Sequence, residues 1–179
     1  MQLFVLDYNP EDAVKSLSDI HLRKMCLETA QILSSIMVNK GVPTCFNMPK
    51  PFNLKHPVIK AINTSKKINW LLEYNHKLHD EYLYRFGKSH SYHSLVDLYK
   101  SKLLKHISEK TEKSDLDFAK DFKDVEILDE DIVEAYRKYY KYKKSIIKQW
   151  KYTNREEPTW LKEMIWHEIL LKMLKTLLS

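Results

Sequence analysis

Residues 19–37 read DIHLRKMCLETAQILSSIM, and this stretch decides the fold of the chain. Its polar side chains recur at spacings of 3, 4, 3 and 4 residues, which places one row of them on a single helical face: His21, Lys24, Glu28, Gln31 and Ser35. Most of the other positions are apolar, whereas a surface helix has one apolar stripe and a broad polar face. The pattern therefore predicts a mostly buried helix with one polar seam.

The polar seam has two interpretations. A buried lysine and a buried glutamate need partners or a wet cavity. Lys24 and Glu28 are four residues apart, so the first interpretation is a structural ion pair. The second is a catalytic cleft, in which Glu28 acts as an acid or base and a desolvated Lys24 acts as a nucleophile.

Length and composition restrict the class of protein. The chain has 179 residues, of which 44% are hydrophobic, enough for one domain with a core. It has no apolar run long enough to span a membrane, and residues 1–6 are too short for a secretory signal. Cys26 and Cys45 form neither a disulfide framework nor a metal-binding spacing, so we expect free thiols. With only 2 glycines, a glycine-rich phosphate loop is excluded.

The periodicity of the whole chain predicts an all-α, single compact domain of about six or seven helices, preceded by a short extended segment at residues 2–6. We expect helices over residues 10–17, 19–38, 57–86 with a break at 63–65, 91–107, 129–150 and 159–178. Residues 1–160 are expected to form the main domain, and residues 161–179 a helical extension packed on it.

Charge is unevenly distributed along the chain. Residues 109–134 hold 11 acidic and 4 basic residues, whereas residues 137–155 hold 8 basic residues and no acidic one. A basic block beside aromatic residues suits a nucleic acid, with Arg137 and Lys143 on phosphates and Tyr140 or Trp150 stacked on a base. The alternative is an ordinary solvated helix face.

A second group of polar residues lies near the end of the predicted helix 57–86. Glu81, Arg85 and Lys88 are spaced 4 and 3 residues apart and share one face. They predict either a Glu81–Arg85 ion pair or, together with His90, a site for an anion. His56 precedes a proline on a loop, where it either forms a local hydrogen bond or contacts a substrate.

His79 and Asp80 are adjacent, and in an all-α protein such a pair is similar to the metal-binding pair of HD phosphohydrolases. That site needs a further histidine and a distant aspartate, which nothing in the spacing enforces. A surface pair of His76 and His79 is the simpler interpretation. We therefore expect no metal and no cofactor.

Several short motifs occur together between residues 3 and 160: LDYNP at 6–10, DIH at 19–21, KM at 24–25, ETAQ at 28–31, HP at 56–57, NW at 69–70, EYLYR at 81–85, GKSH at 87–90, YRKYY at 136–140 and PTW at 158–160. In combination they resemble a family of small phage-encoded proteins. That family is in turn distantly similar to the pyrimidine-dimer DNA glycosylases of the endonuclease V type.

The resemblance implies a catalytic carboxylate. Those glycosylases carry a histidine on the first long helix and the catalytic glutamate seven residues later, as do His21 and Glu28 here. They attack the sugar with the α-amine of a small residue that is exposed when methionine is removed. Gln2 is bulky and normally keeps Met1, so the amine is that of Met1, that of Lys24, or absent.

We therefore expect a DNA-acting enzyme, a base-excision glycosylase or glycosylase/lyase. Its expected catalytic residues are Glu28, Lys24 and His21. The expected substrate contacts are His56, Arg85, Lys88, His90, Arg137, Tyr140, Lys143 and Trp150. The alternatives are a non-catalytic nucleic-acid-binding phage protein and an enzyme of nucleotide or base modification. The resemblance further implies DNA with damaged or modified bases as the partner, no membrane, and the cytoplasm of an infected bacterial host.

Overall fold

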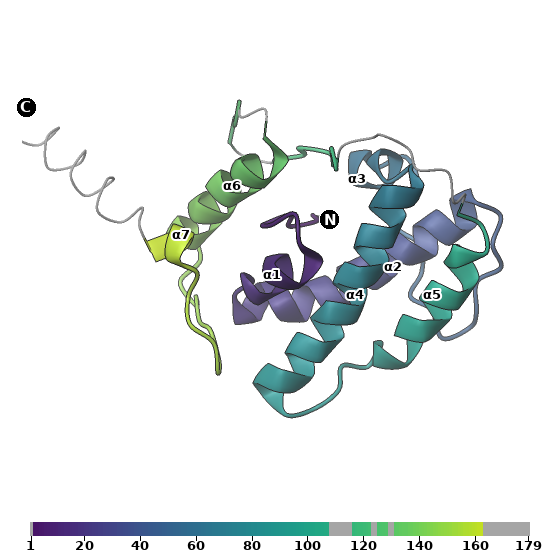
Figure 1. The fold of residues 1–179 in the computed structure, drawn as a ribbon, viewed down its shortest axis with the longest axis horizontal. Coiled ribbons are helices and arrows are strands. Elements are labelled where there is room, and N and C mark those ends of the chain that lie inside the picture. The colour runs from purple at the N-terminus through teal and green to yellow at the C-terminus, as the bar shows by residue number, and fades with distance from the viewer. Residues whose placement is uncertain (1, 108–115, 123–124, 129–130, 163–179) are drawn as a thin grey trace, which may run out of the picture.

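The computed structural model describes residues 2–107, 116–122, 125–128 and 131–162. Within these ranges the chain forms seven α-helices and one 3-10 helix (Figure 1): α1 (Pro10–Lys15), α2 (Asp19–Asn39), α3 (Pro57–Ala61), α4 (Ser65–Phe86), η1 (His93–Leu95), α5 (Val96–Leu104), α6 (Ile132–Ile146) and α7 (Thr159–Lys162). The same ranges contain no strand, so the predicted all-α class is confirmed.

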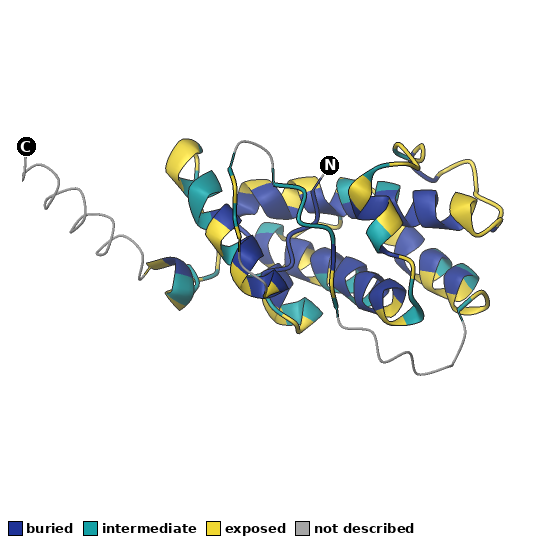
Figure 2. Cartoon of the chain, turned by 90° about the horizontal axis from the view of Figure 1, so that it is seen from above, coloured by how far each residue is buried: buried dark blue, intermediate teal, exposed yellow. Residues whose placement is uncertain are grey.

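α2 and α4 are the two long helices, and they pack against each other in the middle of the molecule (Figure 1). α1 packs on α4 near its second half, and α5 packs on α4 from another side. Buried residues cover most of the circumference of α2, and Figure 2 shows the buried residues of the helices in dark blue. The predicted buried helix is therefore confirmed. The residues of its polar seam differ in exposure. His21 and Ser35 are buried, Glu28 and Gln31 are half-buried, and Lys24 is exposed.

Local sequence signals set the ends of α3 and α4. His56 caps α3, and Thr64 Oγ1 accepts a hydrogen bond from Lys67 N at 3.3 Å at the start of α4. Gly87 has φ +65, a left-handed conformation that favours glycine, and its N–H donates to Leu83 O at 2.8 Å. The predicted break at residues 63–65 and the predicted stop at Gly87 are both confirmed.

The extended segment 2–6 lies between α2 and α6. Leu3, Val5 and Leu6 are fully buried, because they pack into the core shared by these helices. Phe4 packs its ring edge-on against Tyr140 of α6, with the ring centroids 5.1 Å apart. The start of the chain is therefore an internal part of the fold.

Three predicted helices are shorter in the structure. The helix expected over residues 10–17 ends at Lys15. The helix expected over residues 91–107 begins only at His93, as η1, and ends at Leu104. The helix expected over residues 129–150 begins at Ile132, because the Asp131 carboxylate caps it by accepting Glu134 N at 2.8 Å. It ends at Ile146, where the chain becomes extended and carries the Trp150 ring back against His21.

The last predicted helix, over residues 159–178, is described only in its first turn, α7. Leu161 in that turn is buried in the core. The rest of this helix, and with it the extension expected over residues 161–179, lies outside the described residues. Among the described helices, none has the length and apolarity needed to cross a bilayer.

The buried guanidinium of Arg85 joins α4 to the N-terminal part of the chain. The Arg85 side chain is 0% exposed. Its Nε donates to Glu81 Oε1 at 2.7 Å, and its Nη1 donates to Leu17 O at 2.7 Å and Asp19 Oδ1 at 3.2 Å. Its Nη2 donates to Lys15 O at 3.0 Å. Arg85 thus links α4 to the turn between α1 and α2.

The two carboxylates of this cluster are also bound from the far end of the chain. Arg155 donates to both oxygens of Glu81, at 2.8 and 2.7 Å, and Thr153 donates to Asp19 through its backbone N–H and its hydroxyl. Burial alone would raise the pKa of Glu81 and of Asp19, but these hydrogen bonds hold both pKa values below their ordinary ones. We call the five residues Asp19, Glu81, Arg85, Thr153 and Arg155 the Arg85 cluster.

Replacing Arg85 with alanine should lower the free energy of unfolding by about 3–5 kcal/mol, because Glu81 and Asp19 would be left as buried charges without their central partner. Urea titration followed by circular dichroism measures this change. Lys88→Ala, an exposed basic residue three positions later, is the control and should change it by less than about 0.5 kcal/mol. Equal effects of the two variants would contradict the central role of Arg85.

Candidate active site

The Glu28 carboxylate lies between an amine-bearing side chain and the start of the chain. Its Oε2 is 3.4 Å from the backbone N of Gln2, and its Oε1 is 3.4 Å from Lys24 Nζ. The Glu28 side chain is 14% exposed, so it is accessible from one side only. A carboxylate in this position can accept a proton from a neighbouring amine or stabilise a positive charge that develops beside it.

Lys24 differs from the expectation of a desolvated nucleophile. Its side chain is 57% exposed, because α2 turns this position toward solvent. The predicted i,i+4 ion pair with Glu28 does form, although a half-exposed pair of this kind adds little stability. Lys24 thus places a positive charge at the outer edge of the Glu28 carboxylate.

His21 lies beneath the site as a packed, neutral ring. Its Nδ1 is 3.0 Å from both Ser18 Oγ and Tyr140 Oη. Burial, reinforced by the positive charges of Lys24 and Lys143, lowers the pKa of His21 to about 3. His21 is therefore uncharged near neutral pH and holds the N-terminal end of α2 against α6, rather than reaching a substrate as expected.

Three tyrosines of α6, Tyr136, Tyr139 and Tyr140, are buried in the core. Tyr140 is fully buried and its Oη accepts Ser18 N at 2.7 Å, so the expected stacking of Tyr140 on a base does not fit. Lys143 Nζ lies 5.0 Å from the centre of the Tyr139 ring, and its charge is close enough to affect His21. Lys143 thus adds a positive charge near His21, as Lys24 does.

A groove of about 550 Å³ lies beside the N-terminal turn of α2. Its lining residues come from that turn and from the segment after α6: Asp19, Ile20, Arg23, Lys148, Gln149, Trp150, Lys151 and Thr153. Three of them are basic, and the acidic one, Asp19, already belongs to the Arg85 cluster. Trp150 is half-buried here, with its ring centroid 5.2 Å from that of His21. The groove can therefore accommodate an anionic chain beside an aromatic ring.

The groove and the Glu28 carboxylate lie on the same helix, α2, and the groove residue Ile20 is two turns before Glu28. Ile20, Lys24 and Glu28 follow one another at intervals of four residues and share a helical face. Asp19 N also donates to Lys151 O at 2.8 Å, which ties the two walls of the groove together.

Arginines that were expected to hold phosphates are used inside the protein. Arg85 is at the centre of the Arg85 cluster and is fully buried. Arg137 donates from Nε to Leu6 O at 3.0 Å and from Nη2 to Asp7 Oδ2 at 3.1 Å, so it fixes the N-terminal segment to α6. Neither guanidinium is oriented toward a ligand outside the protein. A fork of five donors suits such backbone and carboxylate contacts.

The remaining predicted contacts lie away from Glu28. His56 Nδ1 accepts Val58 N at 3.3 Å, and its Nε2 is 3.4 Å from Asp121 Oδ2, so His56 has a local structural role. Lys88 is exposed just after α4. His90 lies beside Cys26, which is two positions from Glu28 on α2 and therefore faces another side of the helix.

Neither interpretation of the segment around His79 fits the described structure: the surface pair of His76 and His79 does not form, and the His79–Asp80 pair of the HD phosphohydrolases is absent. His79 is buried, whereas Asp80 is exposed and lies 3.7 Å from His76 Nε2. Adjacent residues on a helix point in different directions, which is why the pair is divided. The site of an HD phosphohydrolase is therefore not formed by these residues.

Sequence reasoning missed two parts of this site. The approach of Gln2 to Glu28 joins residues 26 positions apart, and its only signal was the buried apolar run that follows Gln2. The groove residues Arg23, Lys148 and Lys151 were not singled out. Lys148 and Lys151 belong to the basic block 137–155, and that block was the available signal.

A family model described as pyrimidine dimer DNA glycosylase matches residues 1–94, more than half of the chain. The chain belongs to the pyrimidine dimer DNA glycosylase family. This membership confirms the resemblance noted from the motifs and places the chain, at the level of the family, among DNA-repair glycosylases. No curated protein and no solved structure matches the chain.

The matched region of this pyrimidine dimer DNA glycosylase family member covers α1 to α4 and includes Gln2, Lys24 and Glu28. α6 and the basic segment after it lie beyond residue 94. The family match therefore covers the Glu28 carboxylate and the N-terminal segment. It does not include Lys143, Lys148 or Lys151. The phage source and the host cytoplasm stay predictions.

Proposed function

We propose that this chain is a base-excision DNA glycosylase or glycosylase/lyase that uses Glu28 and an adjacent amine. The observation that supports this proposal is the position of Glu28, with the backbone N of Gln2 at 3.4 Å and Lys24 Nζ at 3.4 Å on its two oxygens. In a family of DNA glycosylases, a carboxylate that lies beside a lysine amine and beside the second residue of the chain suits covalent catalysis through a Schiff base.

The proposed reaction begins when the amine lone pair attacks C1′ of the damaged nucleotide. The bond from C1′ to the base breaks, and the base leaves with the electron pair and takes up a proton. The sugar ring then opens to give a Schiff base at C1′. Glu28 stabilises the positive charge that develops at C1′ and moves the protons. In the lyase branch a C2′ proton is removed, the 3′ phosphate is eliminated, and water finally hydrolyses the Schiff base.

Of the two amines, we propose the α-amine of Met1 as the nucleophile. Met1 precedes Gln2 in the sequence, and the backbone N of Gln2 lies 3.4 Å from Glu28 Oε2. An α-amine ordinarily has a pKa near 8, compared with about 10.4 for a lysine, so more of it is neutral near neutral pH. Lys24, which is mostly exposed, then contributes positive charge beside the substrate.

DNA would lie along the groove that leads away from Glu28. Arg23, Lys148 and Lys151 would contact phosphates, and Lys24 and Lys143 would flank the reacting nucleotide. Trp150 is one of the residues that line the groove, and the indole ring of Trp150 is held in place by its packing against His21. A fixed ring of this kind can stack on a base that has been taken out of the duplex.

Glu28→Gln should reduce the rate of base excision by about 100- to 10,000-fold, because the amide cannot exchange a proton or balance the positive charge. The measurement is single-turnover cleavage of a duplex carrying one defined pyrimidine dimer. The affinity for the same duplex should change less than about tenfold, since the carboxylate does not bind phosphate. Glu73→Gln on α4 is the matched control and should retain the wild-type rate.

A rate that is unchanged in Glu28→Gln would remove the carboxylate from the mechanism. The alternatives, a DNA-binding protein without catalysis and an enzyme that modifies nucleotides or bases, make different predictions in the same assay. The first gives binding without cleavage in the wild type. The second gives a chemically altered base in an intact strand.

Sodium borohydride should trap a covalent adduct between the wild-type protein and the damaged DNA, because it reduces a Schiff base to a stable amine. We expect the adduct to survive in Lys24→Ala. We expect it to disappear when the chain is extended by several residues before Met1, which moves the α-amine away from Glu28. Loss of the adduct in Lys24→Ala, with the extended chain still trapped, would assign the nucleophile to Lys24 instead.

Replacing Lys148 and Lys151 together with glutamine should weaken DNA binding and lower its salt dependence. Each lost phosphate contact reduces the slope of log K against log salt concentration by about 0.9, so the double variant should lose about 1.8. Fluorescence anisotropy over a range of salt concentrations measures the slope. The control is Lys100→Gln with Lys105→Gln, two exposed lysines at α5; an equal loss there would mean that the groove is not the binding surface.

A further inference from the structure

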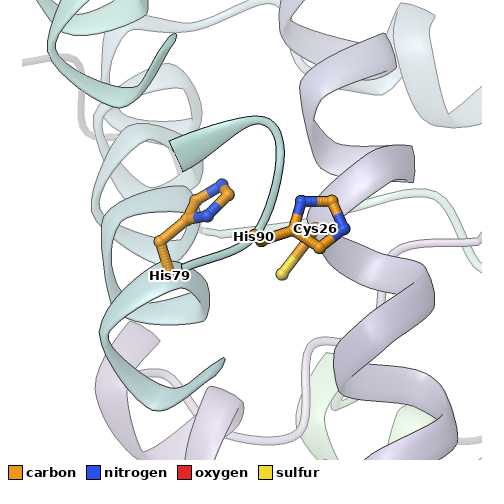
Figure 3. A group of neighbouring side chains, drawn as sticks. All are labelled: Cys26, His79 and His90. Atoms are coloured by element: carbon orange, nitrogen blue, oxygen red, sulfur yellow. The ribbon is translucent and has the colours of Figure 1, made fainter. Parts of the chain in front are cut away.

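Three side chains with metal-binding atoms converge on the side of α2 away from Glu28 (Figure 3). Cys26 comes from α2, His79 from α4, and His90 from the segment between α4 and η1. One potential ligand atom from each residue lies within 4.8 Å of the other two. The residues are far apart along the chain, so sequence spacing gave no reason to expect them together.

His79 is the most informative member of this group. The residue is 1% exposed, and neither of its ring nitrogens has a hydrogen-bond partner within the described part of the chain. A buried polar atom without a partner costs about 1–3 kcal/mol, so an imidazole in this state calls for a ligand. A metal ion would use the lone pair of one ring nitrogen.

The protonation states suit a metal. Burial, together with the neighbouring rings of His90, His93 and His76, lowers the pKa of His79 to about 4, so its ring is neutral, as ligation requires. Burial also lowers the pKa of His90. Burial raises the pKa of the Cys26 thiol to about 12. A bound cation would oppose that effect, and Cys26 would then lose its proton on binding.

The geometry of His90 sets a condition on binding. Tyr92 N donates to His90 Nδ1 at 3.3 Å, a long hydrogen bond. Ligation through Nε2 would place the ring proton on Nδ1 and break this bond, whereas ligation through Nδ1 would replace it. The three ligand atoms all lie within 4.8 Å of one another, so at most a small movement of the segment around His90 brings them to the separations of ligands on one zinc ion.

We propose that Cys26, His79 and His90 bind one divalent transition-metal ion of the zinc type. One thiolate and two imidazoles favour zinc over magnesium or calcium, which prefer oxygen ligands. His90 is only half-buried, so a fourth position faces solvent. The ion would join α2, α4 and the segment after Gly87. The ion would stabilise the contact between these segments and would take no part in the chemistry proposed at Glu28.

The first test is binding of cobalt to the full-length chain after dialysis against a chelator. We expect one equivalent of Co²⁺ to give a thiolate-to-cobalt charge-transfer band in the near ultraviolet, and Zn²⁺ to displace it. Cys26→Ser should lose this band and bind the metal more than about 100-fold more weakly, since even the loss of an outer partner costs up to about that factor. Cys45→Ser, which removes the exposed cysteine, should keep the band.

The second test keeps the proposal falsifiable if Cys26→Ser folds poorly. Thermal unfolding is followed with Zn²⁺ and with a chelator. Zn²⁺ should raise the melting temperature of the wild type by several degrees and leave that of His79→Gln unchanged. His76→Gln, on the exposed side of the same helix, should keep the full shift. The proposal is overturned if the wild type takes up no stoichiometric metal, or if the Cys26→Ser and His79→Gln variants respond to metal as the wild type does.

Discussion

The buried guanidinium of Arg85 is the constraint on which the arrangement of the helices depends. A charge with no exposure has to be surrounded by acceptors, and these acceptors come from the end of α1, the start of α2, α4 itself and, through shared carboxylates, residues 153 and 155. Asp19 has a double role, because it binds Arg85 and also starts α2, the helix that carries Glu28. The position of the candidate catalytic carboxylate is therefore fixed through a polar cluster at one end of its helix.

Local features were predictable because they depend on residues close together in sequence. The helix beginning at Asp19, the break before Ser65, the stop at Gly87 and the Lys24–Glu28 pair all follow from spacing, capping and backbone preference. Glu28 was also singled out as a candidate, first from the polar seam and then from the family resemblance, and its catalytic role stays a prediction.

Features that depend on distant contacts were not predictable. Glu81 and Arg85 have the spacing of a surface ion pair, and only Asp19 and Arg155, 66 and 74 residues away from their partners, explain why the pair is buried. Tyr140 has an aromatic ring that could stack on a base, but its hydroxyl forms hydrogen bonds with Ser18 and His21 inside the core. Cys26 and His79 lie close together because α2 packs across α4. The sequence pattern of one helix does not indicate which residues of the other helix it contacts.

The burial of the chain start has a consequence for when the protein becomes active. Gln2 approaches Glu28 of α2 and Phe4 packs against Tyr140 of α6. The walls of the groove are joined by the hydrogen bonds from Asp19 N to Lys151 O and from Thr153 to Asp19. During synthesis the first and the last parts of the candidate site, Gln2 and Thr153, leave the ribosome far apart in time. The carboxylate and the groove can therefore meet only after the segment that follows α6 has been released, so a nascent chain that ends before this segment carries no assembled site.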